Sequence, residues 1–178
     1  MSDARSLLIL YGSQSGNSEE IAINAGKFSS KNNLNPTVRA MDEVTVSDII
    51  SQTRILICCS TWGDGEQPDN AEDLWEAANS ADITSLNNIN FSVLALGDSS
   101  YDLFCESGKE WDNWFETKGA NRIHPRVDCD VDFEEPAKMW MEQSIQKMSE
   151  LNVESGVEII IPDKEIAKNS DVIDNSVS

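Results

Sequence analysis

The sequence predicts an α/β protein: a five-stranded parallel sheet with helices on both faces. Short, nearly all-apolar runs alternate with longer amphipathic stretches along the chain, which is typical of repeated βα units. The apolar runs fit strands that are buried on both faces, as the strands of a parallel sheet are. With 178 residues, the chain can fill one core but is too short for two comfortable domains.

Five segments have the composition of strands. They are Ser6–Tyr11, Pro36–Ala40, Arg54–Ser60, Asn90–Leu96 and Arg122–Val127. The second begins with a proline, which is typical of an edge strand, and the fifth is the weakest. Because the others are almost wholly apolar, we expect them to lie inside the sheet.

Helices are expected between the strands, where apolar residues recur at helical spacing. The stripes are Ile21, Ala25 and Phe28; Ala71, Leu74, Trp75 and Ala78; Phe104, Gly108, Trp111 and Phe115; and Met141, Ile145 and Met148. We expect Asp69 or Asn70 to cap the second of these helices, and the last to begin near Glu134. A short extra helix is expected near Val46–Ile50.

The C-terminal segment differs in composition from the rest. We expect residues 1–150 to form the folded domain and residues 151–178 an extension. Val157–Ile161 could add a short strand or pack as an extended arm. The residues after Pro162 are polar and mixed in charge, so the chain is expected to be flexible from about residue 163.

Charge and cysteine usage narrow the class of protein. The formal net charge is −19, from 13 basic and 32 acidic residues, which argues against binding to nucleic acid or to an anionic membrane. No apolar run approaches the length of a membrane span, and the N-terminus lacks the pattern of a signal peptide. Cys58, Cys59, Cys105 and Cys129 form no C-x-x-C pair, which favours buried thiols in a reducing compartment. We expect a cytoplasmic monomer without a metal site.

The loop after the first strand has the composition of a phosphate-binding loop. It runs from Gly12 to Ser18 (GSQSGNS) and leads into a helix N-terminus, which carries a partial positive charge. Gly12 and Gly16 allow a tight turn, and the serines and Asn17 add neutral donors. The loop holds no Lys or Arg, so it is neither a P-loop nor a dinucleotide fingerprint. The alternative is a serine-rich turn that only caps the helix.

Two aromatic residues follow neighbouring strands. Trp62 follows the third strand and is flanked by Gly63 and Gly65, and Tyr101 follows the fourth strand and Gly97. Ligands of open parallel sheets bind outside the carboxyl ends of the strands, where two aromatic rings could enclose a planar ligand. The alternative is that both side chains only cover the end of the sheet.

Three segments resemble flavodoxins, and in particular the FMN domains of sulfite reductase flavoproteins and diflavin reductases. They are Tyr11–Glu20 (YGSQSGNSEE), Ser60–Asn70 (STWGDGEQPDN) and Leu94–Cys105 (LALGDSSYDLFC), with a weaker match at Arg126–Asp130. Their order and spacing are those of the family, over roughly residues 6–148. The resemblance implies a strand order of 2-1-3-4-5. The connection between Lys118 and Glu134 is too short for the insertion of long-chain flavodoxins, so a short-chain type is expected.

The resemblance also implies noncovalent FMN and its binding residues. The loop of residues 13–18 would hold the phosphate, Trp62 and Tyr101 would flank the isoalloxazine ring, and Gly63 would lie near N5. Diflavin relatives usually carry Tyr at the position of Trp62. The full set of expected FMN-binding residues is Ser13, Gln14, Ser15, Gly16, Asn17, Ser18, Ser60, Thr61, Trp62, Gly63, Gly65, Leu96, Gly97, Asp98, Tyr101, Phe104 and Cys105.

By this resemblance the chain is an electron carrier and not an enzyme. It would pass electrons one at a time between a flavin reductase and an acceptor enzyme, without its own NAD(P)H-binding module and without a catalytic acid, base or nucleophile. The alternatives are an FMN-dependent quinone reductase, which needs an open pocket above the ring, and a non-redox FMN-binding module.

Nearly half of the 32 acidic residues fall in three segments that follow the carboxyl ends of predicted strands. They are Asp64, Glu66, Asp69, Glu72, Asp73 and Glu76; Asp98, Asp102 and Glu106; and Asp128, Asp130, Asp132, Glu134 and Glu135. These segments contain no Lys or Arg, so the acids should form one rim that attracts basic redox partners. The alternative is that this charge serves solubility alone.

Overall fold

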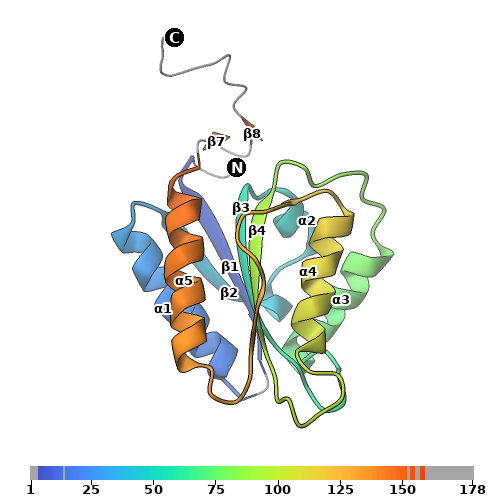
Figure 1. Cartoon of the computed structure of the whole chain (residues 1–178). Helices are drawn as coiled ribbons and strands as arrows, with labels where there is room; N and C mark the ends of the chain where they lie inside the picture. The colour runs from blue at the N-terminus through green and yellow to red at the C-terminus, as the bar shows by residue number, and fades with distance from the viewer. Residues whose placement is uncertain (1–3, 14, 152, 155–156, 159–178) are drawn as a thin grey trace.

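The computed structural model describes residues 4–13, 15–151, 153–154 and 157–158. Its main sheet has the strand order β2-β1-β3-β4-β5, with β6 also pairing with β4 (Figure 1). The first four strands in the chain are β1 (Ser6–Gly12), β2 (Asn35–Ala40), β3 (Arg54–Ser60) and β4 (Asn90–Leu96). All the neighbours in this sheet pair in parallel, so the predicted fold class and strand order are confirmed.

The fifth strand differs from the prediction. The expected single strand Arg122–Val127 is two short strands, β5 (Asn121–Arg122) and β6 (Val127–Cys129), which pair with opposite ends of β4. Pro125 lies between them and has no N–H to donate to a ladder. There the side chain of Ser92 on β4 replaces a backbone donor, because its Oγ donates to the carbonyl oxygen of His124 at 3.0 Å. Residues 123–126 therefore follow β4 without strand geometry.

Helices cover both faces of the sheet (Figure 1). One face carries α1 (Asn17–Lys31) and α5 (Glu134–Ser149), and the other carries α2 (Val46–Ile50), α3 (Asp69–Ser80) and α4 (Glu106–Thr117), with the 3₁₀ turn η1 (Met41–Glu43) beside them. Successive side chains of a strand alternate between the two cores. Leu7 and Ile9 pack with α1 and α5, whereas Leu8 and Leu10 pack toward α3 and α4.

The N-terminal ends of α3 and α4 also differ from the predictions. Residue 69 already lies in α3, and the cap position is Pro68, so neither Asp69 nor Asn70 caps the helix. The Asn70 side chain instead accepts a hydrogen bond from the backbone N–H of Ser13, at 2.9 Å. Phe104 precedes α4, which begins at Glu106. The predicted stripe therefore contributes to α4 only from Gly108 onward.

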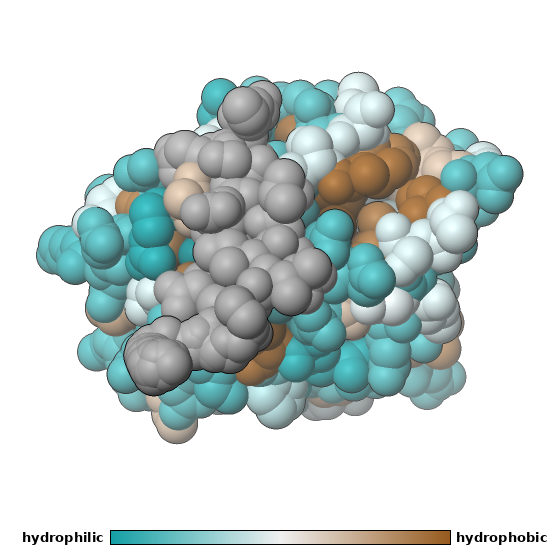
Figure 2. Space-filling model, turned by 90° about the horizontal axis from the view of Figure 1, so that it is seen from above, coloured by the Kyte–Doolittle hydropathy of each residue, from teal (hydrophilic) through white to brown (hydrophobic). Residues whose placement is uncertain are grey.

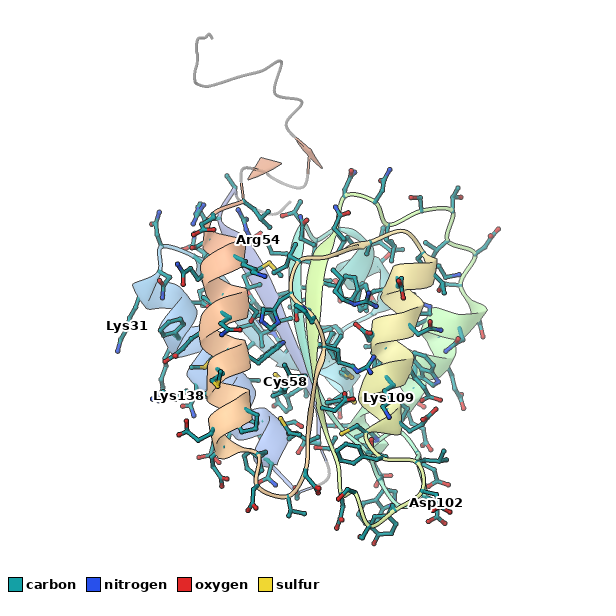
Figure 3. All side chains as sticks on the ribbon, viewed as in Figure 1. Lys31, Arg54, Cys58, Asp102, Lys109 and Lys138 are labelled. Carbon is teal, nitrogen blue, oxygen red and sulfur yellow. The ribbon has the colours of Figure 1, made fainter. Side chains whose placement is uncertain are left out.

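The ends of the described unit are tied together at the amino edge of the sheet. Arg54, at the start of β3, has no solvent exposure and donates to the carbonyl oxygens of Ala4, Met148 and Leu151 at 2.8–2.9 Å. Arg5 also donates to the carbonyl oxygen of Ser149, at 2.9 Å. Figure 3 shows Arg54 beside the C-terminal end of α5. The start of β1 and the end of α5 thus lie together.

The chain beyond α5 is described only in part. The short strands β7 (Val153–Glu154) and β8 (Val157–Glu158) pair antiparallel, apart from the main sheet. The rest of the predicted strand or arm, Ile159–Ile161, and the segment expected to be flexible from about residue 163 lie outside the described residues. Figure 2 shows the amino edge from above, with hydrophilic residues over much of its coloured surface and an apolar area on one side. Of the helices in the described residues, none is long and apolar enough to span a membrane.

Candidate functional site

A cleft of about 270 Å³ lies at the carboxyl ends of β1, β3 and β4. Its lining comes from the three loops that the sequence singles out. The lining residues are Ser15, Asn17, Ser60, Thr61, Trp62, Gly63, Leu96, Gly97, Asp98, Tyr101, Leu103 and Cys105. All of these except Leu103 belong to the predicted set. Asp102, on the loop after β4, lies at this end of the sheet, opposite the end that carries Arg54 (Figure 3).

The loop after β1 forms a turn before α1. Gly16 has a left-handed backbone, with φ of +95°, a conformation that favours glycine. Its N–H donates to Ser13 Oγ at 2.8 Å, so this hydroxyl serves the loop itself as an acceptor. Ser15 and Asn17 line the cleft instead. Gln14 lies outside the described residues.

The first turn of α1, beside this loop, contains backbone donors that have no acceptor within the helix. The first helical bond runs from the N–H of Glu20 to the carbonyl oxygen of Gly16, at 3.0 Å. The preceding N–H groups, of Asn17, Ser18 and Glu19, therefore have no acceptor within the helix. Buried Ser18 shares a hydrogen bond of 2.7 Å with Ser60 Oγ on β3. These neutral donors and the helix dipole fit a phosphate group that needs no Lys or Arg.

The loop after β3 forms a closed turn that carries Trp62. The backbones of Trp62 and Glu66 exchange two hydrogen bonds of 2.8 Å. Gly63 and Gly65 lie between them with φ of +53° and +120°, and the second value suits glycine alone. A Cβ at Gly65 would lie 2.6 Å from Leu103 Cδ1, so this glycine makes room for Leu103.

Both ends of the Trp62 turn are held by α4. The N–H of buried Ser107 donates to Thr61 Oγ1 at 3.0 Å, and its Oγ donates to the carbonyl oxygen of Glu66 at 2.7 Å. The next side chain, Gln67, accepts from Trp111 Nε1 at 3.1 Å and donates to Glu110 at 2.9 Å. Between these two anchored ends lies the segment from Gly63 to Gly65, in which the N–H of Gly65 donates to the carbonyl oxygen of Trp62 at 3.2 Å.

The pKa of the Glu110 carboxyl, which accepts a hydrogen bond from Gln67, is raised in the folded protein. Partial burial is the main cause, and the neighbouring Glu106 acts in the same direction, whereas the hydrogen bond from Gln67 opposes both.

Burial also raises the pKa of the Cys105 thiol, to about 12. Cys105 lines the cleft but is fully buried, so it is not poised as a nucleophile.

The loop after β4 forms a second turn, which carries Tyr101. The Asp98 carboxylate accepts from the N–H and the Oγ of Ser100, at 2.9 and 2.6 Å. The N–H of Tyr101 donates to the carbonyl oxygen of Asp98 at 3.0 Å. Phe104 does not line the cleft; its ring lies 5.6 Å from the Lys109 ammonium.

Three large apolar side chains lie exposed at the cleft. The exposed fractions are 48% for Trp62, 50% for Tyr101 and 48% for Leu103. Exposed aromatic rings on a cleft that also holds a phosphate loop are suited to stacking on a flat, phosphorylated ligand.

Among the described residues, no group of three His, Cys, Asp or Glu side chains could hold a metal ion.

Acidic side chains follow β3, β4 and β6 at the end of the sheet that forms the cleft, and one of them, Asp98, lines it. Asp64, Glu66, Asp102 and Asp132 are exposed, and Asp98 is half-buried. Arg126, also near this end of the sheet, is bound to Asp112 and Asp128. The potential at the mouth of the cleft is therefore negative.

Three contributors to the site were missed by sequence reasoning. Leu103 lines the cleft, Asn70 holds the Ser13 backbone, and Ser107 joins the Trp62 turn to α4. The only signal for Leu103 is its position two residues after Tyr101. Ser107 and Asn70 act through contacts between segments distant in the chain, and nothing in the local pattern marks them.

Comparisons with known proteins agree with this geometry. The sequence model of the flavodoxin family matches residues 9–140. The chain is 43% identical over 147 residues to the sulfite reductase [NADPH] flavoprotein alpha-component of Bacillus subtilis (strain 168), covering 83% of this chain and 24% of that protein. The protein of the same name from Shewanella oneidensis is 39% identical over 137 residues, 77% of this chain and 23% of that protein. The chain thus spans about a quarter of the length of these curated relatives.

Solved structures give the same result. The flavodoxin of Streptococcus pneumoniae TIGR4 superposes with a TM-score of 0.72 at 28% identity, over 81% of this chain and 97% of that one. A cysteine-to-alanine variant of the Pseudomonas aeruginosa flavodoxin superposes with a TM-score of 0.70 at 26% identity, over 80% and 98%. Together with the neutral phosphate loop and the paired aromatic side chains, these matches show that the chain belongs to the flavodoxin family and is an FMN-binding electron-transfer domain.

Proposed function

We propose that this domain carries electrons one at a time on noncovalent FMN, from a flavin reductase to a separate acceptor enzyme. The observation that carries the proposal is the pair Trp62 and Tyr101, half-exposed on neighbouring loops of one cleft. Two aromatic side chains that cover a flavin ring leave its edge as the route for electrons. They also hinder a second substrate from stacking on the ring for hydride transfer, which a quinone reductase requires.

The residues of the chain bind and orient the cofactor. FMN supplies the redox chemistry when bound, so no side chain has to act as acid, base or nucleophile. We assign the phosphate to Ser15, Asn17 and the first N–H groups of α1, and the ring to the space between Trp62 and Tyr101. The peptide at Gly63, which lines the cleft, would then face the polar edge of the ring.

We infer the redox partners of this domain from the names of its relatives and from the negative charge near the cleft. The Bacillus subtilis relative is named as the flavoprotein component of an NADPH-dependent sulfite reductase. We therefore propose an enzyme of the sulfite reductase kind as the acceptor, and an NADPH-dependent flavin reductase, outside the flavodoxin unit described here, as the donor. The acidic mouth of the cleft favours basic surfaces on both. We expect the domain to work as a monomer in the cytoplasm.

The test is a reductive titration of the FMN-loaded protein, followed by visible absorption. The proposal expects tight binding of FMN and a long-wavelength band of the one-electron-reduced flavin that rises and then falls. Bleaching in a single two-electron step, together with turnover of a quinone by the lone protein, would support the quinone reductase instead. A protein that fails to bind added FMN would overturn both.

Matched variants locate the cofactor. Trp62→Ala and Tyr101→Ala should each weaken FMN binding by about tenfold or more, since stacking on an aromatic ring contributes roughly 1–3 kcal/mol. Trp62→Phe and Tyr101→Phe, which keep an aromatic face, should retain most of the affinity. Equal affinities of all four variants and the unaltered protein would remove both side chains from the FMN site.

A further inference from the structure

Asp130 joins the loop after β6 to the loop after β4. Its Oδ1 accepts a hydrogen bond of 3.0 Å from the backbone N–H of Ser99, and its Oδ2 accepts one from the Ser99 hydroxyl. The same Oδ1 accepts from the N–H of Val131 at 2.8 Å. These three donors lower the pKa of the Asp130 carboxyl, so it is ionised at neutral pH.

This contact continues the pairing of β4 with β6 beyond the ends of both strands. The last paired residues are Leu96 and Cys129, and the N–H of Gly97 still donates to the carbonyl oxygen of Cys129, at 2.9 Å. Past this point the backbones exchange no further bond in the described part of the chain. The Asp130 side chain then reaches Ser99 and so connects the two loops.

β6 provides a fixed base for this contact. Arg126 donates to Asp112 at 2.8 Å and to Asp128 at 2.7 Å. Asp112 is a nearly buried residue of α4, with 5% of its side chain exposed. The ion pairs therefore hold the residues on either side of Val127 against α4.

The turn that Asp130 holds is the one that presents Tyr101. Residues 98–101 are closed locally by the bonds of Asp98 to Ser100 and Tyr101, so they behave as one unit. Half of the Tyr101 side chain is exposed, which means that few contacts of its own fix the ring. The position of the ring depends on where the turn lies, and Ser99 is the residue of that turn bonded to Asp130.

We propose that Asp130 is a positioning residue for the FMN site: acting through Ser99, it holds the Tyr101 turn against the end of β6. Asp130 does not itself line the cleft. The inference rests on the proposed function, because it assigns Asp130 a role in binding the flavin. Its loss should let the turn move away from the cleft and weaken the contact of Tyr101 with the ring.

The chain offers variants that separate this role from charge. Asp130→Asn removes one negative charge and the ionic acceptor. Asp132→Asn removes the same charge at a nearby exposed residue of the same loop. Ser99→Ala removes the hydroxyl without changing the charge, and Ser99→Thr restores it. Loss of a negative charge alone should strengthen the binding of FMN, because FMN is an anion. Loss of a positioning contact should instead weaken the binding of FMN.

The experiment measures FMN dissociation constants and amide hydrogen exchange of residues 98–102 in the FMN-free protein. We expect Asp130→Asn and Ser99→Ala to weaken FMN binding by about 3- to 10-fold, the size of the net contribution of one ordinary hydrogen bond, and to speed exchange in the turn. Ser99→Ala should also shift the reduction potentials of bound FMN although no charge has changed. Asp132→Asn should bind FMN at least as tightly as the unaltered protein and show the same exchange, and Ser99→Thr should match the unaltered protein in both.

Two results would overturn the inference. One is an Asp130→Asn affinity equal to that of Asp132→Asn, and the other is a Ser99→Ala variant that binds and exchanges like the unaltered protein. Failure of the unaltered protein to bind FMN is a different result, because it overturns the proposed function itself. The two failures are therefore distinguishable in a single series of measurements.

Discussion

The Nε of Arg54 donates a hydrogen bond of 2.9 Å to the carbonyl oxygen of Met148, joining the start of β3 to the last turn of α5 within the protein interior. The last carbonyls of a helix have no partner within the helix. A fully buried guanidinium requires such acceptors, because an unpaired buried charge is strongly unfavourable. Arg54 therefore donates to carbonyl oxygens at the end of α5, and these carbonyls supply the acceptors that its buried guanidinium requires.

Replacing Arg54 should destabilise the fold. Arg54→Met keeps much of the side-chain length but removes every donor, and we expect a loss of about 2–4 kcal/mol in the free energy of unfolding. Urea unfolding monitored by tryptophan fluorescence measures it. Arg39→Met, at an exposed residue that donates to the carbonyl of the adjacent Val38, should stay within about 0.5 kcal/mol. Equal effects of the two variants would contradict the role given to Arg54.

The contact of α4 with β4 should not tolerate a methyl group at Gly108. A Cβ there would lie 2.3 Å from Ala95 Cβ and 2.8 Å from its Cα, so Gly108→Ala should destabilise the protein by about 1–3 kcal/mol. Gly26→Ala on α1 is the matched control. Its Cβ would approach only the end of the Val38 side chain, at 2.9 Å, and the gain in helix propensity of about 0.5–1 kcal/mol offsets that contact. Thermal unfolding should rank the two variants in this order.

Glu110 should make the stability of the protein depend on pH. Its pKa is raised in the folded state from an ordinary value of 4.5, so the folded state favours the protonated carboxyl. The resulting contribution of Glu110 to the free energy of unfolding is complete below pH 4.5 and is lost as the pH rises through the raised pKa. Glu110→Gln should therefore gain stability relative to the unaltered protein between about pH 4 and pH 7. Glu72→Gln, an equal charge change at an exposed residue of α3, serves as the control for net charge.

The four thiols should be inert in the folded protein. All four cysteines are buried, and burial raises the pKa of Cys129 to about 11 and that of Cys105 to about 12. At about pH 8 a disulfide reagent should therefore react only as fast as the protein unfolds, and fully in denaturant. Fast labelling of one thiol in the native protein would show that this residue, and the strand or cleft around it, opens locally.

Electron transfer to a basic acceptor should depend on salt. With cytochrome c as a basic one-electron acceptor, the rate should fall as ionic strength rises. Asp64→Asn and Asp102→Asn, at the mouth of the cleft, should lower the rate at low salt and flatten its salt dependence. Asp82→Asn, just beyond the C-terminal end of α3, is the control, because this residue lies toward the amino edge of the sheet, away from the cleft. The same loss in all three variants would indicate an effect of net charge and not of the rim.

Most of the sheet could be predicted from the sequence because β1, β3 and β4 are nearly continuous apolar runs that end at glycine or a polar loop. The cleft could be predicted because the carboxyl ends of β1, β3 and β4 necessarily meet at one edge. This rule placed Trp62 and Tyr101 on one cleft. The resemblance to flavodoxins supplied the full set of expected residues, of which eleven line the cleft.

The remaining errors have a common physical cause, which is contact between segments distant in the chain. Asn70 is a residue type that often caps helices, but its side chain accepts a hydrogen bond from the N–H of Ser13 on the loop after β1 instead. The split between β5 and β6 depends on Pro125 and on the Ser92 hydroxyl from β4. That Gly65 and Phe104 contact the ligand stays a prediction; in the structure Gly65 makes room for Leu103, and the Phe104 ring lies near the Lys109 ammonium. Local spacing does not encode these pairings.

The joining of the start of β1 to the end of α5 has a practical consequence for immobilising the protein. Both points lie at the edge of the sheet away from the cleft (Figure 1), so a tag placed there leaves the cleft open to solution. The seven residues of β1 separate that edge from the cleft by roughly 20 Å. An electrode at the tagged end would be separated from the flavin by the length of a strand, which hinders direct electron transfer. A dissolved partner could still reach the flavin through the open cleft.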